Sequence, residues 1–128
     1  MRSSLQVLAA GLVLALSAPA HADVDLPEQA QCYFDAVAAE DAEAVGACFA
    51  EDGWILDVNR EIRGRQAIVR WAQNEVIGGV YTLHEVTPGK DGVQVLVTFV
   101  PPGASSGFKA NYVISIRDGI ASMVLSYA

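Results

Sequence analysis

The second half of the chain, from Val80 to the C-terminus, is a series of short stretches typical of β-strands. Apolar and polar residues alternate from Val93 to Val100, and again from Phe108 to Arg117, which places every second side chain on one face of a strand. Turn signals at 88–92, 101–107 and 117–119 separate the stretches. The pattern predicts four consecutive antiparallel strands, at about 80–86, 93–100, 108–117 and 120–127.

Three helices are expected before these strands. Apolar residues recur at helical spacing between positions 26 and 37, which predicts an amphipathic helix over 27–39 with Pro27 in its first turn. Asp41 is a suitable N-cap for a second helix over 42–50, and Gly64 opens a third helix over 65–77. An acidic turn at 51–53, a short strand over 54–57 and a return at 61–63 lie between the second and third helices.

This order of elements indicates an α+β domain. A strongly curved sheet that wraps against helices leaves an open-ended cavity between the two layers, and such a cavity is the first place to look for a functional site.

The first 22 residues have the pattern of an export signal. Arg2 is followed by an apolar run from Leu5 to Leu16, and Ala20-His21-Ala22 supplies the small residues that precede signal cleavage. The run is shorter than the ~20 apolar residues of a membrane span. We therefore expect a cleaved signal peptide, residues 1–22, and a periplasmic or secreted domain, residues 23–128, without stable membrane insertion.

The expected mature domain is strongly acidic. The full chain has 8 Lys+Arg against 15 Asp+Glu, and loss of Arg2 with the signal peptide leaves a formal net charge of −8. A surface of this sign repels phosphate backbones, which argues against a nucleic-acid partner.

The two cysteines, Cys32 and Cys48, fall on the first two predicted helices. In an oxidising compartment they could form a disulfide that ties these helices together. The alternative is that both are small apolar packing residues. Two cysteines without a supporting histidine cluster do not indicate a metal site.

Asp57 and Tyr33 are the leading candidates for chemistry. Asp57 ends the first predicted strand, where partial desolvation at a cavity mouth could make it a general base. Tyr33 lies on the core-facing stripe of the first helix, where its hydroxyl needs a partner. The alternative is a solvated turn carboxylate and a tyrosine that serves only in packing.

Large aromatic side chains could line a pocket for a flat apolar ligand: Trp54, Trp71, Phe99, Tyr112 and Tyr127. They could equally form an ordinary core. His84, the only histidine after the predicted signal peptide, is expected to be structural or exposed. The chain has no phosphate-binding glycine loop, no His-Glu-x-x-His and no nucleophile elbow, so neither a cofactor nor a metal is expected.

Several short motifs resemble the nuclear-transport-factor-2-like superfamily, and within it the SnoaL-like proteins and ketosteroid isomerases. They are the Phe-x-x-Asp turn at 49–52 and the Gly-x-x-Ala-Ile start of the third helix at 64–68. The resemblance implies a conical roll with three N-terminal helices on a strongly curved, mostly antiparallel sheet. In those isomerases a tyrosine on the first helix donates to the substrate oxygen, and an aspartate at the end of the first strand moves the proton. Tyr33 and Asp57 occupy the corresponding positions.

One feature of the isomerases is missing. Their second acidic oxyanion donor has no counterpart around Ala110-Asn111-Tyr112-Val113, where only Tyr112, or Asn111 if the register shifts, could substitute. Losing one such donor typically slows a reaction by ~10²–10³. The signal-peptide pattern and the resemblance together predict an exported domain that binds a small, largely apolar ligand in a conical pocket. An isomerase or cyclase using Asp57 and Tyr33 is an alternative, and a non-catalytic module that forms a homodimer through its sheet is another.

Overall fold

The computed structural model describes residues 25–128, and the predicted signal peptide lies outside this part of the chain. Three α-helices precede most of the sheet: α1 (Glu28–Ala38), α2 (Ala42–Ala47) and α3 (Arg65–Trp71), which continues directly into a π-helical turn, η3 (Ala72–Val76). Asp41 caps α2, its side chain accepting a hydrogen bond from the Ala44 N–H at 3.0 Å. No helix in residues 25–128 has the length and apolar character needed to cross a membrane.

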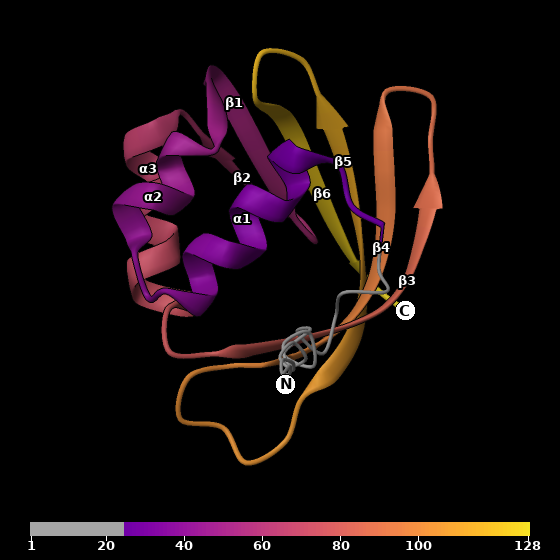
Figure 1. Ribbon diagram of the computed structural model, residues 1–128. Coiled ribbons are helices and arrows are strands. Elements are labelled where there is room, and N and C mark those ends of the chain that lie inside the picture. Colours follow the sequence, from indigo (N-terminus) through magenta and orange to yellow (C-terminus); the bar gives the residue numbers. More distant parts are fainter. Residues whose placement is uncertain (1–24) are drawn as a thin grey trace, which may run out of the picture.

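Six strands form one sheet in the order β2-β1-β6-β5-β4-β3. They are β1 (Phe49–Asp57), β2 (Arg60–Arg63), β3 (Val80–Pro88), β4 (Gly92–Val100), β5 (Phe108–Ile116) and β6 (Ile120–Tyr127). All neighbours are antiparallel except β1 and β6, which run parallel. Figure 1 shows the sheet curving around the helices, so the expected α+β conical roll is confirmed.

The predicted acidic turn at 51–53 is instead part of β1, which begins at Phe49 rather than near Trp54. Phe49 pairs with Ile120 of β6, and the pairing shifts register before Trp54. Arg65 also donates two hydrogen bonds to the Phe49 carbonyl. Long-range pairing to the last strand therefore extends this segment, although its local composition is typical of a turn. For the same reason the second helix ends at Ala47, before the predicted position 50.

The core lies between the helices and the concave face of the sheet. Its largest fully buried side chains come from both layers and include Tyr33 on α1, Ile68 on α3, and Ile55, Ile114 and Met123 on the strands. Burial alternates strictly along β4, where Val93, Val95, Val97 and Phe99 are buried. The alternation fixes which strand residues can reach a site between the layers.

A disulfide joins Cys32 of α1 to Cys48, the C-cap residue of α2. Their Cα atoms lie 5.8 Å apart, within the range that a bridge requires. Cys32 is exposed and Cys48 is buried, so the bond ties α1 to the interior at the point where α2 leads into β1. The bridge also fixes the part of α1 that carries the neighbouring Tyr33.

Candidate functional site

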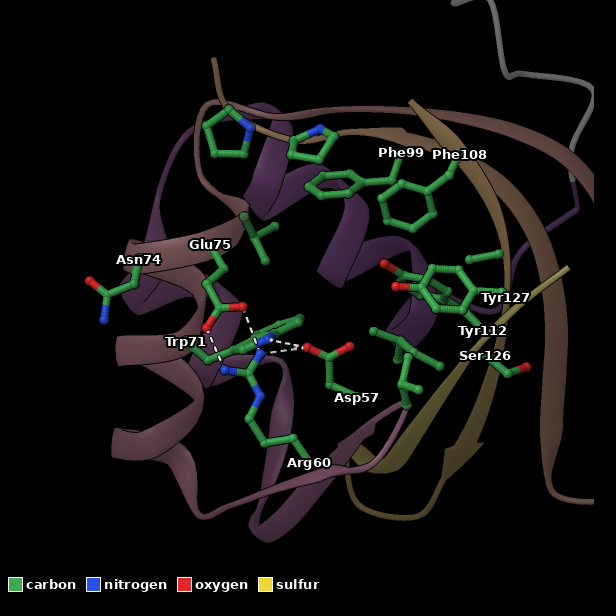
Figure 2. A pocket seen from close by; sticks show the side chains of 16 residues that line it. Asp57, Arg60, Trp71, Asn74, Glu75, Phe99, Phe108, Tyr112, Ser126 and Tyr127 are labelled. Carbon is green, nitrogen blue, oxygen red and sulfur yellow. Dashed lines mark hydrogen bonds and ion pairs between the residues drawn. The ribbon is translucent and has the colours of Figure 1, made fainter. Parts of the chain in front are cut away.

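A cavity of about 560 Å³ opens between η3 and the ends of β1, β4, β5 and β6. Most of its wall is apolar or aromatic, with polar groups concentrated near the end of β1. Figure 2 shows the lining side chains: Asp57, Val58, Arg60, Trp71, Asn74, Glu75, Val76, Phe99, Pro101, Pro102, Phe108, Ala110, Tyr112, Leu125, Ser126 and Tyr127. Cavities of this size in other proteins hold small organic molecules.

Asp57 reaches the cavity because of strand alternation. It lies two residues beyond the fully buried Ile55, so the two side chains share the concave face of β1. Its Oδ2 accepts hydrogen bonds from Trp71 Nε1 at 3.2 Å and Arg60 Nη2 at 2.7 Å. Among residues 25–128, Oδ1 has no hydrogen-bond partner, and in Figure 2 it faces the side of the cavity that holds Tyr112 and Tyr127.

Arg60 connects the β1–β2 turn to the π-helical turn across the cavity rim. Besides its bond to Asp57, it donates two hydrogen bonds to Glu75, at 2.6 and 2.8 Å. The Arg60 side chain is 53 % exposed, so these ion pairs add little to stability. Their effect is geometric, because they occupy one oxygen of Asp57 and leave the other free to face a ligand.

The π-helical turn brings Glu75 to this position. Ile77 N–H donates to the Ala72 carbonyl five residues earlier, a pattern that is rare and often marks functional sites. Asn74, Glu75 and Val76 of this turn line the cavity, and in Figure 2 Glu75 points toward Arg60 whereas Asn74 extends away from the cavity. A regular helix over 65–77, as predicted from the sequence, would place these side chains differently.

Tyr112 lies on the concave face of β5, separated from Asp57 by one strand, because both residues pair with Leu125 of β6. It is 4 % exposed, and Figure 2 shows its hydroxyl directed toward the side of the cavity that holds Asp57. That hydroxyl lies 2.7 Å from the Tyr81 hydroxyl, which in turn lies 2.8 Å from the Tyr33 hydroxyl. A chain of three phenols therefore runs from the buried face of α1 to the cavity.

All three phenols resist ionisation. Burial raises the pKa of Tyr112 above its usual value, and the negative charge of Asp57 raises it further. Burial likewise raises the pKa of Tyr33 and Tyr81 well above the ordinary range. At neutral pH the Tyr112 phenol therefore keeps its proton.

Five of the residues predicted from the sequence line this cavity: Asp57, Trp71, Phe99, Tyr112 and Tyr127. Tyr33 does not, because it is fully buried and its hydroxyl is bonded to Tyr81. Trp54 does not either, because it lies three residues before Asp57 and so projects from the opposite face of β1. There Arg63, its partner in β2, stacks over the indole at 5.2 Å.

Sequence reasoning missed Tyr81, Arg60 and Glu75 as members of this arrangement. Tyr81 could have been found, because it lies two residues from Leu83 and so shares the same face of β3, the strand that pairs with β4. Glu75 could not, since the π-helical turn that directs it leaves no clear local signal. His84 is exposed and bonds Thr98 at 2.7 Å, away from the cavity. No three His, Cys, Asp or Glu side chains within residues 25–128 gather closely enough to hold a metal ion.

A family model for the SnoaL-like domain matches residues 30–122. The chain belongs to the SnoaL-like domain family. A search of curated proteins found no match to this chain. The solved structures that this chain resembles confirm the family's fold.

Three of these structures illustrate the range of the SnoaL-like fold. A candidate polyketide cyclase from Sinorhizobium meliloti is 26% identical, with a TM-score of 0.70 over 80% of this chain and 96% of that one. A protein from Catenulispora acidiphila with a ketosteroid-isomerase-like fold, in complex with trimethylamine, is 21% identical, with a TM-score of 0.67 over 81% and 88%. A computationally designed 17-OHP binder is 16% identical, with a TM-score of 0.69 over 78% and 88%.

Proposed function

We propose that this SnoaL-like domain binds a small, largely apolar molecule that carries at least one polar oxygen. The observation that carries the proposal is the cavity of about 560 Å³, in which apolar and aromatic side chains surround Asp57 and Tyr112. The apolar walls would bind the body of the ligand, and the two polar groups would orient it.

Two further observations support this function. Of the proteins that share this fold, one is a designed binder of 17-OHP and another is in complex with trimethylamine. The Cys32–Cys48 disulfide is typical of an oxidising compartment and supports our proposal that the domain is exported, to the periplasm or outside the cell.

We expect a homodimer through the outer sheet face to be compatible with binding, since Val113 on that face is 40% exposed.

The proposal predicts that a thermal-shift screen will identify ligands among small aromatic ketones, alcohols and hydrocarbons. A compound present at about ten times its dissociation constant should stabilise the domain by about 1.4 kcal/mol and raise Tm by roughly 5–10 °C. Phe108→Ala should reduce this shift, because Phe108 lines the cavity and packs edge-on against Phe99.

Trp54→Ala is the matched control, since it removes an aromatic side chain from the opposite face of the sheet. It should leave the ligand-induced shift unchanged. Absence of any stabilising compound, or an equal loss of shift in both variants, would count against the cavity as the binding site.

A second candidate function is a cofactor-independent isomerase or cyclase. The geometry favours it at one point: the free Oδ1 of Asp57 and the protonated phenol of Tyr112 face the same cavity. Asp57 would take a proton from the carbon next to a carbonyl, the electron pair of that C–H bond would form a carbon–carbon double bond, and the π pair of the carbonyl would move onto its oxygen. Tyr112 would donate to this oxygen, with Tyr33 behind it in the phenol chain rather than in direct contact.

This step predicts catalysed exchange of carbon-bound protons in D₂O. The methyl protons of 2-acetylnaphthalene, a small aromatic ketone, should be replaced by deuterium faster with the domain than in buffer, as followed by NMR. Asp57→Asn keeps the size of the side chain but removes the base, so it should bind the ketone and lose about 10² or more of the exchange rate. Equal exchange rates in the two proteins would rule out Asp57 as the base and leave ligand binding as the function.

A further inference from the structure

The three hydrogen-bonded phenols come from three different elements: Tyr33 from α1, Tyr81 from β3 and Tyr112 from β5. Their hydroxyls form two bonds of 2.8 and 2.7 Å, and their rings pack mostly edge-to-face around Tyr81. Tyr81 is the central member and does not line the large cavity. The role of this residue is therefore indirect, and the inference below rests on the proposed ligand-binding function.

The direction of the two hydrogen bonds follows from a count of protons. Three hydroxyls carry three protons but make only two bonds among themselves, so one proton must point elsewhere. If Tyr112 donated to Tyr81 and Tyr81 to Tyr33, the spare proton would sit on Tyr33. That side chain is fully buried, and among residues 25–128 its hydroxyl has no partner other than Tyr81.

A spare proton on Tyr81 would also lack an acceptor. In that arrangement Tyr33 and Tyr112 both donate to the Tyr81 oxygen, and the Tyr81 proton has no hydroxyl left to bind. A buried hydroxyl without an acceptor is unfavourable. Only the order Tyr33 to Tyr81 to Tyr112 leaves the spare proton on the hydroxyl that reaches the cavity, where a ligand oxygen can accept it.

We infer that Tyr81 is a positioning residue that fixes this order, so that Tyr112 presents a hydrogen-bond donor to the carbonyl or other neutral acceptor oxygen of the ligand. A hydroxyl that accepts a hydrogen bond becomes a stronger donor in its own hydrogen bond. Tyr112 accepts from Tyr81, so Tyr81 also strengthens the hydrogen bond that Tyr112 donates to the ligand. An anionic ligand group is disfavoured at this point, because the Asp57 carboxylate faces the same space.

The first test needs no ligand. Tyr81→Phe leaves the buried Tyr33 hydroxyl without an acceptor, so Tm should fall by several degrees, whereas Tyr33→Phe should cost less because Tyr81 still donates to Tyr112. The double variant Tyr33→Phe/Tyr81→Phe removes the stranded hydroxyl and should be more stable than Tyr81→Phe alone. A Tyr33→Phe variant that loses as much stability as Tyr81→Phe would overturn the inferred order, because in the reverse order Tyr33→Phe leaves the Tyr81 proton without an acceptor.

The second test uses two probes of similar shape, 2-acetylnaphthalene and 2-ethylnaphthalene, of which only the first has an acceptor oxygen. Wild type should bind the ketone about tenfold more tightly than the hydrocarbon, corresponding to one donated hydrogen bond. Tyr112→Phe should abolish this preference, and Tyr81→Phe should reduce it about threefold.

A purely structural role of Tyr81 would weaken binding of both probes equally and leave their ratio unchanged, which would overturn the positioning role. If neither probe binds to wild type, the proposed binding function fails for this ligand class. The stability order of the Tyr33 and Tyr81 variants would still decide the direction of the phenol chain, so the two failures can be told apart.

Discussion

Removal of the Cys32–Cys48 disulfide is expected to lower the free energy of unfolding by about 3 kcal/mol. This is the contribution expected from the conformational entropy that a bridge closing a loop of this size removes from the unfolded chain. The bridge spans a sequence separation of 16 residues and connects α1 to the start of β1. For a domain of about 100 residues, the loss corresponds to a fall in Tm of roughly 10–20 °C. Because Tyr33 follows Cys32 on α1, the phenol chain should loosen as well.

The measurement is urea unfolding of the oxidised protein and of the variant Cys32→Ser/Cys48→Ala. Reduced wild type is the matched control, because it lacks only the covalent bond, whereas the variant also loses the packing of the buried Cys48 sulfur. The reduced protein should account for most of the loss. Equal stability of oxidised and reduced wild type would show that α1 is held by packing alone.

Ala110→Trp is expected to weaken ligand binding by at least about 100-fold, or roughly 3 kcal/mol. Ala110 is buried on the concave face of β5, and its side chain lines the cavity between Phe108 and Tyr112. An indole built there would occupy the space that we assign to the ligand. The cavity already exists, so the larger side chain should cost less stability than it would in a filled core.

Lys109→Trp is the control for this substitution. Lys109 precedes Ala110 on the same strand and is exposed on the opposite face of the sheet, so it carries the same indole away from the cavity. Its ligand affinity, measured by isothermal titration calorimetry with 2-acetylnaphthalene, should equal that of wild type. Comparable losses in both variants would mean that tryptophan acts through general destabilisation and not by filling the site.

Periodicity predicted most of the fold because the strands of the second half are buried on one face only. The alternation in β4 and β5, and the turn signals between them, follow directly from that burial. The predicted start of β1 was wrong because Phe49 pairs with Ile120, about seventy residues away in the chain. A local sequence pattern cannot reveal a pairing over this separation.

The candidate site was predictable where strand parity or a family position specified it. Asp57 shares a face with Ile55, and Tyr112 shares one with Ala110 and Ile114. Trp54 was assigned to the pocket on residue type alone, and its parity with respect to Asp57 contradicts that assignment. The placement of Tyr33 depends on Tyr81, which reaches it from an edge strand, and such contacts between distant elements leave no trace in local spacing.

The most direct test of ligand binding in this cavity is an NMR titration of the ¹⁵N-labelled domain with 2-acetylnaphthalene, repeated on Ala110→Trp. Ligand binding in the cavity should cause saturable shift changes at amides in η3 and the adjoining ends of β4, β5 and β6, and these changes should be lost in the variant. Shift changes confined to the outer sheet face, or a titration that Ala110→Trp leaves unchanged, would contradict the claim that this cavity is the ligand site.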